Sequence, residues 1–190
     1  MEKIKEETVY GGYMKVVKAE FTDGKNIFSR EKIMRPDAVA VLVYNPGKGI
    51  VILTKQFRYP IEDREPENLY EVVAGVVDEG EIPNETAVRE VSEEVGYNIK
   101  VGDLHFLFES YNSVGYSTEK VYYYIAFVDD ENKVSLGGGL KSENENIEVV
   151  EMEYFAFLDL LRNKQIKDTK TLICGFASSL RIGTGNPRLI

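Results

Sequence analysis

The chain has 190 residues, of which 43% are hydrophobic and 29% are charged, and its formal net charge at pH 7 is −9. This length is enough for one domain with a proper core. The dispersed negative charge excludes a surface built to bind nucleic acid or an anionic membrane, because both need clustered Lys or Arg. No apolar run approaches the roughly 18 residues of a membrane span. The charged N-terminus and the lone cysteine, Cys174, predict a cytoplasmic protein.

Residues 1–37 are predicted to form a small antiparallel β segment. Residues 8–35 read as short strands and turns, and the pair Asp23-Gly24 is typical of a hairpin. The segment is too small to form a core alone. We therefore separate it from a main domain over residues 38–190.

The first part of the main domain is predicted to be mostly β. Residues 38–44 are a continuous apolar run, as expected of a strand that is buried on both faces. The turn "NPGKG" leads to a second strand over 50–57, so the two strands are predicted to form a hairpin. A polar loop over 61–68 precedes a short strand within 69–75.

Residues 84–95 are predicted to be helical because Ala87, Val91 and Val95 recur every four residues. Asn84 is the expected N-cap, and Gly96 stands where a C-terminal glycine cap belongs. Beyond it we expect three more strands and two helices. The strands lie within 104–111, 120–128 and 146–155, and the helices within 156–163 and 170–180. Strands before, between and after helices predict an α/β sandwich around a mixed sheet.

Three glutamates, Glu90, Glu93 and Glu94, share one face of the predicted helix within about 100° of arc, because residues i, i+3 and i+4 are neighbours on a helix. The apolar stripe lies roughly 120° around from them. Carboxylates this close repel one another, and a hard cation such as Mg²⁺ would relieve the repulsion.

The wider spacing resembles the signature of the Nudix hydrolases. Gly75 is followed after five residues by Glu81 and after seven more by "REVSEEVGY", residues 89–97. Only Tyr97 departs from the pattern, at a position where the family has an aliphatic residue. The resemblance implies a Nudix-type α/β/α sandwich and hydrolysis of a diphosphate that links a nucleoside to another moiety.

The resemblance also implies a metal site for Mg²⁺ or Mn²⁺. Glu90 and Glu94 would be the main ligands, with Glu93 assisting and the Ala74 carbonyl completing the site. Arg89 would orient the carboxylates by ion pairing. Metals of this kind bridge phosphate oxygens and lower the pKa of an attacking water.

Likeness to the ADP-ribose pyrophosphatase and nucleoside-diphosphate-sugar group extends over most of the chain from about residue 38. By that likeness, Arg58 of "QFRYP" contacts substrate phosphate, and Glu71 of "LYEVVAG" contacts substrate or metal. Glu119 is kept as a further substrate contact. Val114 stands where hydrolases of ADP-ribose typically carry proline.

The stretch "GGGLKSENENIEVVEM" resembles the mobile acidic loop that supplies a general base in this group. Glu143 aligns best with the base and Glu145 next. We expect the three glycines over 137–139 to make the loop a flexible lid. GDP-mannose hydrolases share such a loop.

The leading hypothesis is a pyrophosphatase that converts ADP-ribose to AMP and ribose 5-phosphate. The alternatives are a GDP-mannose hydrolase that gives GMP and mannose 1-phosphate, and a non-catalytic module that senses nucleotide sugars. The group also implies a homodimer in which residues 1–37 cross to the partner.

Overall fold

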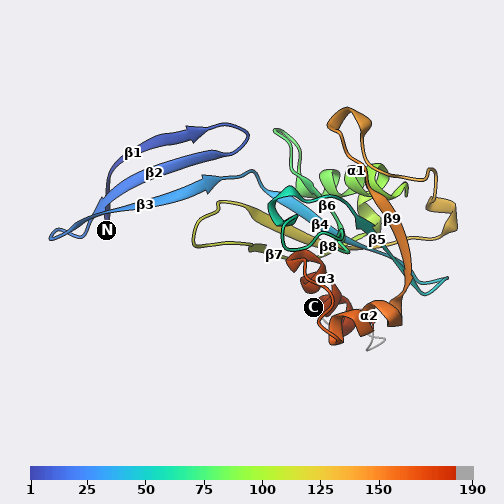
Figure 1. Cartoon of the computed structure of the whole chain (residues 1–190). Helices are drawn as coiled ribbons and strands as arrows, with labels where there is room; N and C mark the ends of the chain where they lie inside the picture. The colour runs from blue at the N-terminus through green and yellow to red at the C-terminus, as the bar shows by residue number, and fades with distance from the viewer. Residues whose placement is uncertain (183–190) are drawn as a thin grey trace.

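The computed structural model describes residues 1–182 of the chain. Figure 1 shows a small sheet that projects from a larger body. The small sheet is antiparallel, with β1 (Glu2–Gly11), β2 (Lys15–Thr22) and β3 (Ile27–Met34) in that order. The Asp23-Gly24 turn joins β2 to β3, and the Asp23 carboxylate accepts from the backbone N–H groups of Lys25 and Asn26 at 2.9 and 2.7 Å.

The body is built on a mixed sheet in the order β7-β8-β4-β5-β9, with β6 paired to β4 beside that path. Its pairs are antiparallel except that β4 and β8 run parallel. The strands are β4 (Ala38–Asn45), β5 (Ile50–Lys55), β6 (Val73–Val76), β7 (Leu104–Tyr111), β8 (Lys120–Phe127) and β9 (Glu148–Glu153).

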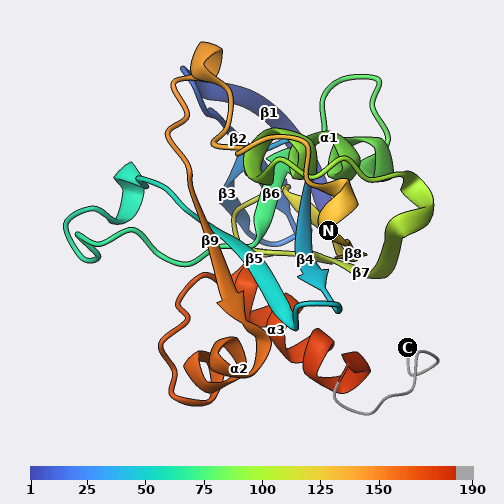
Figure 2. The same ribbon diagram turned by 90° about the vertical axis from the view of Figure 1, so that its right-hand side faces the viewer.

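Helices cover both faces of this sheet, as Figure 2 shows, with α1 on one side and α2 and α3 on the other. They are α1 (Pro83–Val95), α2 (Tyr154–Arg162) and α3 (Thr169–Ile182). Short 3₁₀ turns occupy Tyr59–Ile61, Val101–Asp103, Asp130–Asn132 and Lys141–Glu143. The predicted α/β sandwich around a mixed sheet is confirmed. No helix among residues 1–182 is long and apolar enough to cross a membrane.

Strand β4 divides its side chains between the two cores because successive residues of a strand point to opposite faces. Val39, Val41 and Val43 pack with α1, while Ala40 and Leu42 pack with α2 and α3. This explains the continuous apolar run at 38–44.

One side of β4 is shared by two strands, and this division places the functional helix. β6 pairs with residues 38–41 of β4, and β5 pairs with residues 43–45. Ala87, Val91 and Val95 of α1 are fully buried against the sheet. The polar face of α1 therefore lies beside β6.

Helix α1 begins one residue earlier than expected, and the predicted N-cap at Asn84 is wrong. Ile82 is the N-cap, and Pro83 occupies the first turn. Proline fits there because its fixed φ suits a helix start and its missing N–H is not needed. The helix ends as predicted at Gly96, whose φ of 75° is left-handed.

Candidate active site

Two carboxylates of α1 are buried against strand β6. Glu90 is 8% exposed and Glu94 is 2% exposed. The backbone N–H of Ala74 donates to Glu94 Oε2 at 3.3 Å. A Cβ atom at Gly75 would overlap the Glu90 carboxylate. Glycine at this position therefore allows the close approach of strand and helix that brings the two carboxylates together.

Arg89 binds the carboxylates around it. Its Nη1 donates to Glu90 Oε1 at 2.8 Å and to Glu93 Oε2 at 3.0 Å. Its Nε and Nη2 donate to the two oxygens of Glu81, each at 3.0 Å. The hydrogen bonds from Arg89 and from Thr86 lower the pKa of Glu81 to about 2. Glu81 thus holds Arg89, which in turn orients Glu90 and Glu93.

Burial disfavours the ionised form of the two inner carboxylates, Glu90 and Glu94, and so raises the pKa of both. Loss of hydration raises the pKa of Glu90 to about 7, against the opposing pull of Arg89. Burial and the neighbouring charge of Glu90 raise the pKa of Glu94 well above its ordinary value. Such a pair holds either protons or a cation.

The donor chemistry of this pair fits a hard divalent cation, which prefers carboxylate and carbonyl oxygens. Within residues 1–182, no three His, Cys, Asp or Glu side chains already stand as a complete ligand set. Arg89 holds one Glu90 oxygen, so a bound cation would share these carboxylates with the guanidinium. The Ala74 carbonyl lies on the same side of β6 as its N–H group, toward Glu94, because both groups of a strand residue point the same way.

A cavity of about 270 Å³ opens in front of the carboxylates. It brings acidic side chains of α1 and of the loop before β9 together with two arginines from other parts of the chain. Its lining is Tyr13, Arg35, Arg58, Ala74, Gly75, Val76, Asp78, Arg89, Glu90, Glu93 and Glu145.

Arg58 is fixed by a bidentate ion pair with Glu71. Its Nε and Nη2 donate to the two Glu71 oxygens at 2.8 and 2.9 Å. Glu71 is 3% exposed and also lies 3.6 Å from Lys170 Nζ. Lys170 in turn donates to Asp168 at 2.8 Å. The structure therefore places Glu71 as the support of Arg58, behind the cavity that Arg58 lines.

Residues 34–174 of the chain match the family model of the NUDIX domain. The chain belongs to the Nudix family. Its catalogued relatives include the GDP-mannose pyrophosphatase of Pectobacterium atrosepticum, which is 38% identical over 146 residues, 76% of this chain and 73% of the relative. The GDP-mannose pyrophosphatase of Escherichia coli O1:K1 is 36% identical over 154 residues, 80% of this chain and 78% of the relative.

The fold agrees with that family. A crystal structure described as an ADP compounds hydrolase superposes with a TM-score of 0.76, covering 97% of this chain and 95% of the other, at 22% identity. The predictions of a Nudix fold and of a hydrolase that acts on pyrophosphate bonds are confirmed.

The acidic loop of this Nudix protein reaches the cavity through Glu145. The side chain of Glu145 lines the cavity and accepts from the Leu140 N–H at 3.0 Å. Glu143, the first choice for the base, ends a 3₁₀ turn, and its side chain lies outside the described part of the structure.

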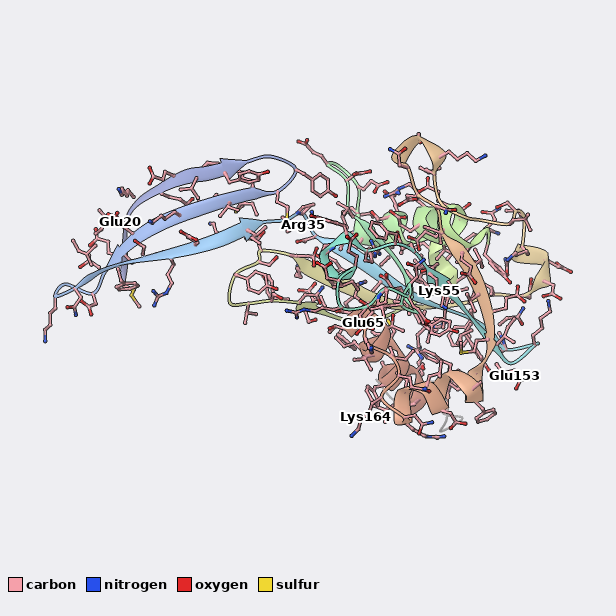
Figure 3. The ribbon with its side chains drawn as sticks, in the orientation of Figure 1. Glu20, Arg35, Lys55, Glu65, Glu153 and Lys164 are labelled. Atoms are coloured by element: carbon pink, nitrogen blue, oxygen red, sulfur yellow. The ribbon has the colours of Figure 1, made fainter. Side chains whose placement is uncertain are left out.

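Glu119 does not line the cavity but stands behind another arginine. Glu119 Oε1 lies 3.6 Å from Arg35 Nε. Thr118 Oγ1 accepts from the Arg35 N–H at 2.8 Å and donates to the Arg35 carbonyl at 2.9 Å. Figure 3 shows Arg35 at the junction of the small sheet and the body.

Sequence reasoning missed Arg35, Tyr13 and Lys170. Arg35 lines the cavity and pairs with the distant Glu119, Lys170 lies near Glu71 behind the cavity, and Tyr13 lies in the turn between β1 and β2. The net charge of −9 indicated only that an anionic substrate would need positive charge at its binding site, and it did not indicate which residues supply that charge.

Proposed function

We propose that this Nudix protein is a metal-dependent pyrophosphatase of nucleoside diphosphate sugars, with GDP-mannose as the first substrate to test. The observation that carries the proposal is the arrangement of the cavity. Glu90, Arg35 and Arg58 line the same space, and Glu94 is buried next to Glu90 on the same helix face. A diphosphate needs cations on its oxygens, and its hydrolysis needs a site for a divalent ion.

Glu90, Glu94, Glu93 and the Ala74 carbonyl would hold Mg²⁺ or Mn²⁺. When bound, such an ion neutralises charge on the phosphate oxygens and acidifies a water. The other roles in the reaction belong to side chains of the protein. Arg89 orients the carboxylates.

Arg58 and Arg35 bind the diphosphate, and each is held in place by a carboxylate behind it. This support matters because a guanidinium that is already oriented loses little side-chain entropy when it binds phosphate. Glu145 takes a proton from the attacking water, whose oxygen bonds to phosphorus as the bond from phosphorus to the bridging oxygen breaks. The products from GDP-mannose would be GMP and mannose 1-phosphate.

Support for GDP-mannose comes from the relatives that are named for it, at 36–38% identity. The likeness of "QFRYP" and "LYEVVAG" to hydrolases of ADP-ribose keeps ADP-ribose as the second candidate, with AMP and ribose 5-phosphate as products. Val114, at the proline position of those enzymes, weighs against it. GDP-mannose therefore becomes the first candidate substrate and ADP-ribose the second, whereas the sequence alone favoured ADP-ribose.

The test is a panel of nucleotide sugars assayed with Mg²⁺, with products separated by chromatography. We expect the highest kcat/KM for GDP-mannose, with GMP and mannose 1-phosphate in equal amounts. A higher kcat/KM for ADP-ribose would replace the first candidate by the second. Binding of nucleotide sugars without turnover of any of them would contradict the proposed activity and favour a sensing module.

A further inference from the structure

The glycine segment Gly137–Gly139 lies against the C-terminal end of α1. The N–H of Gly138 donates to the Glu94 carbonyl at 2.9 Å, and the N–H of Gly139 donates to the Glu93 carbonyl at 3.1 Å. The last carbonyls of a helix have no partner within the helix. The segment therefore supplies partners to the backbone of Glu93, whose side chain lines the cavity, and of Glu94, whose carboxylate is buried against β6.

This contact requires glycine for two reasons. The φ angles of Gly137, Gly138 and Gly139 are 69°, 109° and 77°, all in the region that other residues rarely adopt. A Cβ atom at Gly137 would also overlap the Glu94 carbonyl oxygen and lie 2.7 Å from Val95 Cα. These are backbone atoms of a packed helix, so the loop would have to move away.

The same segment closes the base of the acidic loop. The N–H of Ile147 donates to the Gly138 carbonyl at 3.2 Å, and Ile147 is buried. Within the loop, Leu140 and Glu145 are joined twice: the Leu140 N–H donates to Glu145 Oε2, and the Glu145 N–H donates to the Leu140 carbonyl at 3.2 Å. Glu145 is thus linked through a short chain of backbone contacts to Glu93 and Glu94.

We propose that Gly137–Gly139 is a positioning clamp that fixes Glu145 relative to the carboxylates of α1. The three glycines allow close contact, and the freedom to move is confined to the tip of the loop beyond them. The inference rests on the proposed role of Glu145 in hydrolysis. It differs from the expectation that the three glycines make the loop a flexible lid.

Gly137→Ala tests the clamp, and Gly49→Ala is its matched control. Gly49 has a φ of 67°, close to the 69° of Gly137, but a Cβ atom there would meet nothing within 4 Å. Both variants therefore place alanine at nearly the same positive φ, and only Gly137→Ala is pushed off α1. Displacement of a catalytic group by about 1 Å can cost about 10²-fold in rate.

We expect Gly137→Ala to lower kcat by about 10- to 100-fold and to change KM by less than about threefold, because the diphosphate is held by Arg35 and Arg58. Gly49→Ala should keep the wild-type kcat. In a Glu145→Gln background, Gly137→Ala should cause no further loss. A wild-type kcat in Gly137→Ala, or a loss that multiplies with that of Glu145→Gln, overturns the clamp.

Amide hydrogen exchange of the wild-type protein tests the clamp without any activity measurement and without a variant that must fold. The N–H groups of Gly138 and Gly139 should exchange slowly, and those of residues 141–144 rapidly. Rapid exchange at both glycines overturns the clamp. If Glu145→Gln turns over at the wild-type rate, the proposed base is contradicted, and the exchange result then decides the clamp separately.

Discussion

Glu94 combines near-complete burial with a second buried carboxylate, Glu90, on the same helix face. Within residues 1–182, its carboxylate accepts one hydrogen bond, from the Ala74 N–H. A buried carboxylate with so little compensation costs stability unless a proton or a cation is bound. We therefore expect Glu94 to serve a bound cation rather than the stability of the fold.

Glu94→Gln should therefore keep the fold and lose nearly all turnover. A catalytic metal supplies several kcal/mol of transition-state stabilisation, so we expect kcat to fall by about 10²-fold or more. The control is Glu85→Gln on the exposed face of the same helix, which should keep its activity. Measuring kcat over a Mg²⁺ titration distinguishes weaker Mg²⁺ binding from a lower kcat at saturating Mg²⁺. If Glu94→Gln kept most of the wild-type activity at saturating Mg²⁺, the assignment of Glu94 as a metal ligand would be contradicted.

The raised pKa of Glu90 predicts an unusual dependence of stability on pH. Because its pKa is about 7 in the folded protein and ordinarily 4.5, the folded state binds more protons than the unfolded state between these values. The free energy of unfolding should then fall as pH rises through this window, by about 3 kcal/mol from this group at most.

Urea unfolding of the protein in chelator, at steps from about pH 4.5 to about pH 8, measures this dependence. Glu90→Gln should flatten the profile and should be more stable than wild type at the upper end. Mg²⁺ should restore wild-type stability there. Equal slopes for wild type and Glu90→Gln would show that burial does not perturb this carboxylate.

At the scale of elements, the site is an assembly of one helix, one short strand and one loop. Helix α1 supplies the glutamates, β6 supplies Ala74 and Gly75, and the loop before β9 supplies Glu145. The helix and strand are fixed by apolar packing of Val73 with Ala87 and Val91. The loop has no such core of its own, and its position depends on backbone contacts with the end of α1.

This arrangement predicts which loop glutamate is the base. Glu145→Gln should lower kcat by about 10² to 10⁴-fold, the usual contribution of a general base, with a much smaller change in KM. Glu143→Gln is the matched control from the same loop and should lose less. Steady-state kinetics of both single variants and of the double variant decide between them. A larger loss in Glu143→Gln would return the role to Glu143, and full activity in the double variant would move it to Glu93.

At the scale of the whole molecule, the small N-terminal sheet is set apart from the body (Figure 1). Its edge strand β1 is exposed along its entire length, and Ile4, Val9 and Tyr10 are among its exposed apolar side chains. The last strand is tied to the body where Ile33 exchanges hydrogen bonds with Tyr116 and Thr118. A long exposed strand edge is a surface for pairing with another chain.

We therefore expect a homodimer in which residues 1–37 contact the partner. Light scattering coupled to gel filtration should give twice the mass of one chain at micromolar concentration. Charged substitutions on β1, such as Val9→Lys, should shift the mass toward one chain while the body stays folded. A monomeric mass for the wild-type protein would contradict the dimer.

Local sequence patterns were sufficient to predict most helices and strands of the body and to identify the family. The apolar run at 38–44, the four-residue repeat of α1 and the glycine cap at Gly96 are local signals, because side-chain periodicity follows directly from helix and strand geometry. The spacing from Gly75 to Gly96 lies within one strand–helix unit, so it identified the glutamates before any fold was known. The misplaced N-cap at Asn84 has a local cause as well, since Pro83 starts the helix.

Contacts between distant parts of the chain fix the position of the arginines that line the cavity and of the acidic loop before β9. Arg35 pairs with Glu119, Glu71 lies near Lys170, and Gly138 bonds to the backbone of Glu94. Each contact joins residues far apart in the chain, and no local periodicity encodes such distances. The three glycines show the difference most clearly. As a sequence they indicate flexibility, yet all three have positive φ angles, and at Gly137 the packing against α1 leaves no room for a side chain.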